Sequence, residues 1–132
     1  MRPRYIDADK CTACGLCTKY CPRHLVDQYN EGLAVTRPIH IDYAQAVPAT
    51  YFIDPEACLY LKHGTCQICV CTCQSKAIDF SQKAEEKEIQ IGAVIMAPGF
   101  GRVPDTTLAK YSYGLHPDVM TSLEFERLLC AS

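Results

Sequence analysis

Four cysteines lie within a short stretch of the chain, Cys11 to Cys21, at the spacing C-x2-C-x2-C-x3-C-P. Core packing does not explain this spacing, because a buried free cysteine behaves as a small hydrophobe with no preferred spacing. An iron–sulfur cluster does explain it, since three thiolates two residues apart let one tight loop reach three iron atoms. Gly15 has no Cβ and lets that loop approach a cluster closely. The run therefore predicts a 4Fe-4S site.

An imperfect second copy of this pattern follows. The segment Ile6-Asp7, which leads into the first run, is echoed by Ile53-Asp54, 47 positions later. The copy departs from the first run in its longer Leu59 to Thr65 segment, in Gln74 at the place of Pro22, and in the extra thiol of Cys71. Its four cysteines at matching places are Cys58, Cys66, Cys69 and Cys73. Self-similarity of this kind predicts two halves related by a pseudo-twofold axis.

The repeat predicts how the ligands are shared. In two-cluster arrangements the fourth cysteine of a run binds the other cluster. One cluster is therefore assigned Cys11, Cys14, Cys17 and Cys73, and the other Cys58, Cys66, Cys69 and Cys21. Cys73 is preferred because its x3 spacing matches the first run, with Cys71 as the alternative. Cys130 matches no ligand position, and His63 is interpreted as a surface or packing residue.

Charge and composition limit the function classes. Thirteen basic and fifteen acidic side chains give a net charge of −2, so nothing favours nucleic acid or an anionic membrane. No apolar run reaches the roughly 18 residues of a membrane span, and the N-terminus lacks a secretory signal. We therefore expect a cytoplasmic protein in which disulfides are rare and metal sites common, and clusters sensitive to oxygen suggest an anaerobe. Structural zinc bound by four thiolates is the competing interpretation of the cysteines.

The predicted fold is α+β: a ferredoxin-like two-cluster 4Fe-4S domain in residues 1–83, followed by a C-terminal extension in residues 84–132. Residues 22–52 are interpreted as an insertion that packs over one cluster. Within the domain we expect one helical turn between Leu16 and Tyr20, and a turn at Asn30-Glu31-Gly32. Short strands are predicted at Tyr5-Ile6, Leu25-Val26, Ile39 to Ile41, a segment ending at Ile53, and Ala77 to Phe80.

The C-terminal extension changes character. Ser81 to Glu88 is expected to be a charged hairpin or helical connector, and Ile89 to Ala97 a strand buried on both faces of a sheet. Residues 102–117 are predicted as loop, and Ser122 to Leu129 as a helix capped by Thr121 or Ser122 with Glu124 in its first turn. Without its sheet, the strand 89–97 would offer an unpaired edge, which predicts a homodimer or a tail folded back.

Several segments give the chain a family resemblance. They are Asn30-Glu31-Gly32-Leu33, Gln45-Ala46-Val47-Pro48, Ile53-Asp54-Pro55-Glu56, Ala77-Ile78-Asp79-Phe80, Gly92 to Phe100 and Thr121 to Arg127. With the cysteine runs, they resemble an internal stretch of the A subunit of heterodisulfide reductase and related flavoproteins. The resemblance implies that the extension derives from a dinucleotide-binding flavoprotein domain. Ala97-Pro98-Gly99-Phe100 would match an Ala-Thr-Gly-Phe turn near FAD, from which Pro98 departs.

The resemblance also implies a function. In that family a ferredoxin module passes electrons between FAD and other subunits, in complexes associated with flavin-based electron bifurcation. FAD would then belong to the full-length parent, and the partners would be other subunits or a redox partner protein. No nucleophile–base constellation is visible in the sequence, so electron transfer is the only chemistry that the residues indicate. A fragment retaining FAD and a zinc-stapled interaction module are the alternatives.

Overall fold

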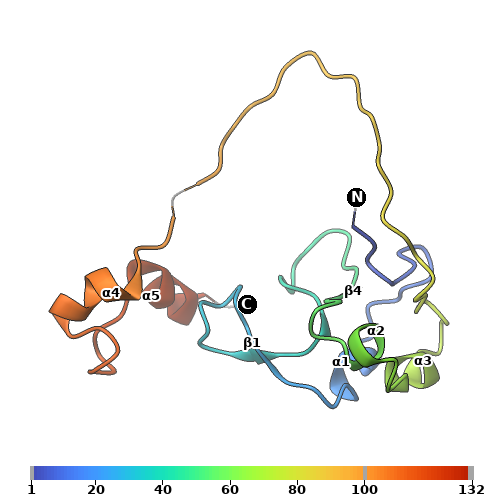
Figure 1. The fold of residues 1–132 in the computed structure, drawn as a ribbon, viewed down its shortest axis with the longest axis horizontal. Coiled ribbons are helices and arrows are strands. Elements are labelled where there is room, and N and C mark those ends of the chain that lie inside the picture. The colour runs from blue at the N-terminus through green and yellow to red at the C-terminus, as the bar shows by residue number, and fades with distance from the viewer. Residues whose placement is uncertain (1, 100, 131–132) are drawn as a thin grey trace. The chain divides into compact units, whose positions relative to one another are not determined.

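The computed structural model describes residues 2–99 and 101–130, which fall into two compact units. One unit extends from the N-terminus to Glu86, and the other from Lys87 to Cys130. Figure 1 shows the order of the helices and strands along the chain. The N-terminal unit combines short helices with two-stranded sheets and is a small α+β domain, as the sequence predicts.

The N-terminal unit contains seven short helices and strands. In chain order they are α1 (Leu16–Lys19), β1 (Leu25–Val26), β2 (Val35–Thr36), β3 (Ile39–His40), β4 (Phe52–Ile53), α2 (Leu59–His63) and α3 (Ile68–Thr72). The strands form two antiparallel pairs, β1 with β2 and β3 with β4. The strands predicted around Ile6 and Ile78 are reduced to one antiparallel bridge between these two residues.

The segments that lead into the two cysteine runs pair crosswise. Ile6, which precedes the first run, bridges to Ile78, which follows the second. Ile53, which precedes the second run, lies opposite Ile39, which follows the first. Each half of the sequence is therefore closed by backbone contacts from the other half.

Backbone hydrogen bonds follow the same 47-residue offset. The Asp7 N–H donates to the Ala77 carbonyl at 2.8 Å, and the Asp54 N–H donates to the Pro38 carbonyl at 2.7 Å. Each aspartate carbonyl also accepts from the amide of the first cysteine in its run, at 3.0 Å for Asp7 and 2.9 Å for Asp54. The two aspartates therefore connect each run both to its own first cysteine and to the other half.

The hairpin formed by β1 and β2 revises the interpretation of the insertion. The predicted strand Leu25–Val26 exists, but it pairs with Val35–Thr36 rather than with a segment that leads into a cysteine run. The predicted turn closes this hairpin, with Glu31 and Gly32 both at positive φ. Because the hairpin lies between the first run and β3, it is β3 that pairs with the segment leading into the second run.

The hydrophobic core of the N-terminal unit is very small. Its buried cluster consists of Ile6, Ile39, Ile53 and Ala77, each at most 3 % exposed. All four belong to the crosswise contacts described above. Partly buried cysteines pack against this cluster, namely Cys11, Cys17, Cys21, Cys58, Cys69 and Cys73. The thiols therefore cover the core, which has few apolar side chains of its own.

The C-terminal unit contains α4 (Asp105–Leu108), the 3-10 helix η1 (Ala109–Tyr111) and α5 (Ser122–Leu129). The prediction of loop throughout residues 102–117 was therefore wrong for 105–111. The prediction of α5 is confirmed together with its cap. The Glu124 N–H donates to Thr121 Oγ1 at 3.2 Å, and the Thr121 N–H donates to Glu124 Oε2 at 2.6 Å.

The predicted strand Ile89 to Ala97 is wrong for the described chain. Residues 87–97 have neither strand nor helix, and Ile95 is 93 % exposed. An alternating apolar pattern forms a strand only where a neighbouring strand supplies hydrogen bonds. The connector predicted from Ser81 to Glu88 also has no helix or hairpin. Among the described residues, no helix has the length and apolarity needed to cross a membrane.

The capping box of α5 predicts a pH dependence. Burial alone would raise the pKa of Glu124, but hydrogen bonds from Tyr113 and Thr121 outweigh it and hold the pKa below its usual value. A carboxyl whose pKa is lowered by folding adds stability above its unfolded pKa, and this is lost as the pH falls through the folded pKa. The helix content of residues 122–129, followed by NMR, should therefore decrease as the solution is acidified below about pH 4.

Replacing the carboxylate tests the same cap at neutral pH. Glu124→Gln should destabilise α5 by about 1 kcal/mol, a typical loss for an N-terminal cap. Glu126→Gln is the matched control, since this residue is exposed on the same helix. Equal helix content in the two variants at pH 7 would show that the cap does not hold the helix.

Candidate metal centres

The first cavity of the N-terminal unit is lined by Cys11, Cys14, Cys17 and Cys73. Three of these cysteines come from the loop before α1 and from α1 itself, and Cys73 follows α3. These are the four residues that the spacing rule assigned to one cluster. The structure therefore brings the fourth cysteine of the second run to the first run.

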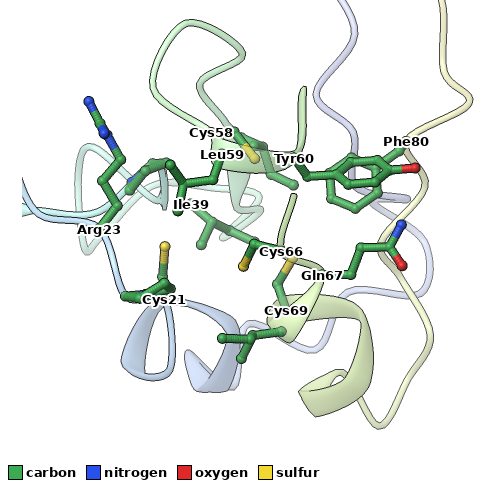
Figure 2. Close-up of a pocket in the computed structure, with 14 residues that line it drawn as sticks. Cys21, Arg23, Ile39, Cys58, Leu59, Tyr60, Cys66, Gln67, Cys69 and Phe80 are labelled. Carbon is green, nitrogen blue, oxygen red and sulfur yellow. The ribbon is translucent and has the colours of Figure 1, made fainter. Parts of the chain in front are cut away.

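The second cavity is lined by Cys21, Cys58, Cys66 and Cys69, which are drawn together in Figure 2. Cys21 comes from the end of the first run and joins three cysteines of the second run, as the sequence assigned. The spaces in the two cavities are about 330 Å³ and about 400 Å³, counting the part open to solvent. No group of three or more His, Cys, Asp or Glu side chains in the described chain is arranged to hold a single metal ion.

The loop around the first cavity depends on left-handed backbone conformations. Ala13 has φ 54°, and Gly15 has φ 74° at the start of α1. A Cβ at Gly15 would also lie only 3.2 Å from the hydroxyl oxygen of Tyr51. Glycine is therefore required here both by its conformation and by the close approach of a side chain.

Tyr51 is a cavity residue that the sequence alone did not single out. Its side chain lines the first cavity and is half-buried there. Burial is the largest cause of a raised pKa of its phenol, and the nearby thiol of Cys17 raises it further. Tyr51 belongs to the predicted insertion 22–52, so that insertion does reach over the first cavity. Its place just before Ile53, in the segment leading into the second run, was the available signal.

Burial affects thiols at both cavities. It raises the pKa of the Cys69 thiol to about 12, with a further contribution from the neighbouring Cys58. Burial also raises the pKa of Cys17. Such thiols are held neutral at physiological pH unless a positive charge, such as a bound metal, favours the thiolate.

Cys73 differs from these two thiols because hydrogen-bond donors surround its sulfur. Burial would raise its pKa, but the Ser75 hydroxyl and the backbone amides of Ala77 and Ile78 outweigh burial and lower it. The Ala77 N–H donates to Cys73 Sγ at 3.2 Å, and Ser75 Oγ lies 3.5 Å from the same sulfur. Cys71, the alternative ligand, is exposed and is not among the residues that line the two cavities.

The remaining candidates lie away from the two cavities. The segment Leu59 to Thr65, expected as an inserted loop, is helical over α2 and ends at Gly64, which has φ 70°. His63 lies in the last turn of α2 and is exposed. Cys130 is exposed at the end of the C-terminal unit. The longer spacing between Cys58 and Cys66 is therefore taken up by a helix.

The chain contains a recognised iron–sulfur binding motif. Residues 4–25 match the family model described as "4Fe-4S binding domain". This match includes the segment around Ile6, the whole first cysteine run and the start of β1. The N-terminal unit is therefore a small α+β domain with a 4Fe-4S binding motif.

Three curated relatives match nearly the full chain, and each is the A subunit of a heterodisulfide reductase. They are that of the ferredoxin:CoB-CoM heterodisulfide reductase of Methanosarcina acetivorans, 41 % identical over 97 % of this chain; that of the H(2):CoB-CoM heterodisulfide,ferredoxin reductase of Methanothermobacter thermautotrophicus, 38 % identical over 99 %; and an iron-sulfur A subunit of the CoB–CoM heterodisulfide reductase of Methanopyrus kandleri, 40 % identical over 99 %. The chain spans 16 %, 19 % and 19 % of their lengths. It is homologous to a part of about 130 residues of the heterodisulfide reductase A subunit, as the resemblance predicts.

The positions of Cys73 and Cys71 generate a matched test. Cys73→Ser should lower the iron content of the anaerobically purified protein and remove one cluster signal from the EPR spectrum of the reduced protein, because it changes the lining of the first cavity. Cys71→Ser should leave both unchanged, because Cys71 is exposed and outside the cavity linings. The opposite result would assign the ligand role to Cys71.

Proposed function

We propose that this chain is an electron-transfer module that holds two 4Fe-4S clusters. One observation carries the proposal: the eight cysteines line two cavities in two sets of four, and each set takes one cysteine from the other run. The crosswise backbone contacts of Ile6 with Ile78 and of Ile39 with Ile53 support the same two-cluster repeat.

The residues around the cavities fit such clusters. Iron–sulfur clusters are held by four cysteine thiolates, and hydrogen bonds to the sulfurs adjust their potentials. The first cavity offers four thiols and a backbone N–H that already donates to one of the sulfurs, Cys73 Sγ. A bound cluster of this type accepts and releases single electrons. The protein's part is to hold the two clusters apart on either side of one small core.

Zinc remains the competing occupant of the four-thiol sets. Structural zinc sites bind four thiolates at about 2.3 Å from one ion. The match of residues 4–25 to a 4Fe-4S binding domain favours iron–sulfur over zinc for the first run. The crosswise lining of the second cavity, which includes Cys21, extends that preference to the second.

The homology suggests a larger context for this module. We propose that it serves as the ferredoxin module of a flavoprotein similar to the heterodisulfide reductase A subunit, with residues 1–83 as the cluster domain and 84–132 as part of an FAD-binding domain. FAD would be bound by the full-length parent. The partners would be other subunits of such a complex or a redox partner protein. In the turn Ala97 to Phe100, Pro98 departs from the family pattern, and Phe100 lies outside the described residues.

Metal analysis tests the proposed function. The anaerobically purified chain should be brown and contain about eight iron atoms and about eight acid-labile sulfides, which corresponds to two clusters of four. Reduction with dithionite should give EPR signals from two clusters. Colourless protein with about one zinc ion per four-thiol set would support the zinc alternative. Bound yellow flavin would support a fragment that retains FAD.

The C-terminal unit offers a surface for a second polypeptide. Ile89, Ile91, Val94, Ile95 and Met96 are all more than 60 % exposed. We propose that residues 89–97 pair with the same segment of a second chain, because an unpaired apolar segment is a template for strand addition. Sedimentation should then show a dimer that Ile91→Lys converts to a monomer, while Lys87→Glu leaves it intact. A monomer with fast hydrogen exchange across 89–97 would contradict this pairing.

A further inference from the structure

The two cavities differ in the hydrogen-bond donors that face their sulfur atoms. At the first cavity, the Ala77 N–H donates to Cys73 Sγ at 3.2 Å, and the Ser75 hydroxyl oxygen is 3.5 Å from the same atom. A cysteine that binds a metal does so as the thiolate, which can only accept. The Ser75 hydroxyl is then the donor. Two donors from one short turn therefore converge on one sulfur.

A second hydroxyl lies at the same cavity. The Tyr51 hydroxyl oxygen lies 3.2 Å from the place where a Cβ on Gly15 would be. Tyr51 and Ser75 both line this cavity. Gly15 directly follows Cys14, so this phenol lies over the loop that carries three of the four thiols. The polar groups come from two different segments, one before the second cysteine run and one after it.

The second cavity has a different lining. Apart from its cysteines it is mostly apolar, with Pro22, Pro38, Ile39, Ile53, Leu59, Ile68 and Phe80 among its residues. Figure 2 shows that the polar ends of Arg23, Gln67 and Tyr60 point away from the sulfur atoms. The Tyr60 ring instead packs against Phe80, with ring centroids 4.4 Å apart. Its lining side chains therefore offer its sulfurs little hydrogen bonding.

This difference has an energetic consequence for clusters. Reduction adds one negative charge to a cluster, and a donor N–H or O–H aimed at a sulfur stabilises that charge. The exposed Arg23 guanidinium acts from a solvated position, where charge interactions are weak. Direct donors at short range should therefore decide which cluster is reduced first.

We infer that the cluster held by Cys11, Cys14, Cys17 and Cys73 has the higher reduction potential, and that the Ser75 hydroxyl is one of the groups that raise it. This inference deepens the proposed function and rests on it. Ser75 acts here as a positioning and tuning residue on a ligand sulfur. One electron supplied by dithionite would then reside mainly on this first cluster, so electrons entering at the second cluster would move toward the first.

The test is an anaerobic redox titration of the full chain, followed by EPR. The wild-type protein should show two midpoints. Ser75→Ala should shift only the higher midpoint to lower potential, which corresponds to a fall of about three- to tenfold in the reduced-to-oxidised ratio at fixed potential. Ser75→Thr keeps the hydroxyl and should restore the wild-type midpoint. Ser81→Ala is the control, because that hydroxyl bonds to Asp79 Oδ1 at 2.6 Å and is exposed.

A second variant identifies the cluster. Cys66→Ser changes only the lining of the second cavity and should leave the higher-potential signal in place. Equal midpoints in the wild-type protein, a shift of the lower midpoint in Ser75→Ala, no shift, or loss of a cluster in Ser75→Ala would each overturn the inference. Absence of any cluster signal from the wild-type protein would instead overturn the proposed function, so the two failures are distinguishable.

Discussion

The crosswise packing of Ile6, Ile39, Ile53 and Ala77 is the contact on which the N-terminal unit depends. These side chains are the only ones in its buried cluster among the described residues, and six cysteines pack against them. So few buried apolar groups give a domain of this length little hydrophobic stabilisation. Metal–thiolate bonds can supply the rest, because the binding energy of a structural metal site is also folding energy. The thiols are therefore both the walls of the cavities and a large part of the fold.

Sharing of cysteines between the halves follows from the same packing. Asp7 and Asp54 each connect the segment before a run to the opposite half and to the first cysteine of their own run. A run held in this way carries its last cysteine toward the other half, where Cys21 and Cys73 line the far cavities. Neither cavity is complete without both runs. Two sites built like this share one core, so a change at one site is felt by the other.

The sequence was most informative where a local rule determines the structure. Cysteine spacing predicted which thiols share a cavity, and the pattern Thr121 to Glu124 predicted the cap of α5. Pattern alone could not choose between β1 and β3 as the partner of β4, because both are short apolar segments after the first run. It also mistook residues 89–97 for a strand, since their alternation says nothing about whether a neighbour is present. Non-local pairing was the missing information in both cases.

Departures from the repeat are what make the two cavities unequal. Pro22, which follows Cys21, has no N–H to donate, whereas the chain after Cys73 continues with Gln74 and Ser75. The turn after the second run can therefore place an amide and a hydroxyl on the sulfur of Cys73, as observed. Proline at the corresponding place of the first run removes one backbone donor next to Cys21. A single substitution between otherwise matching halves thus changes the electrostatics of one site while the sulfur positions are preserved, which is how a duplicated motif can hold two chemically similar groups at different potentials.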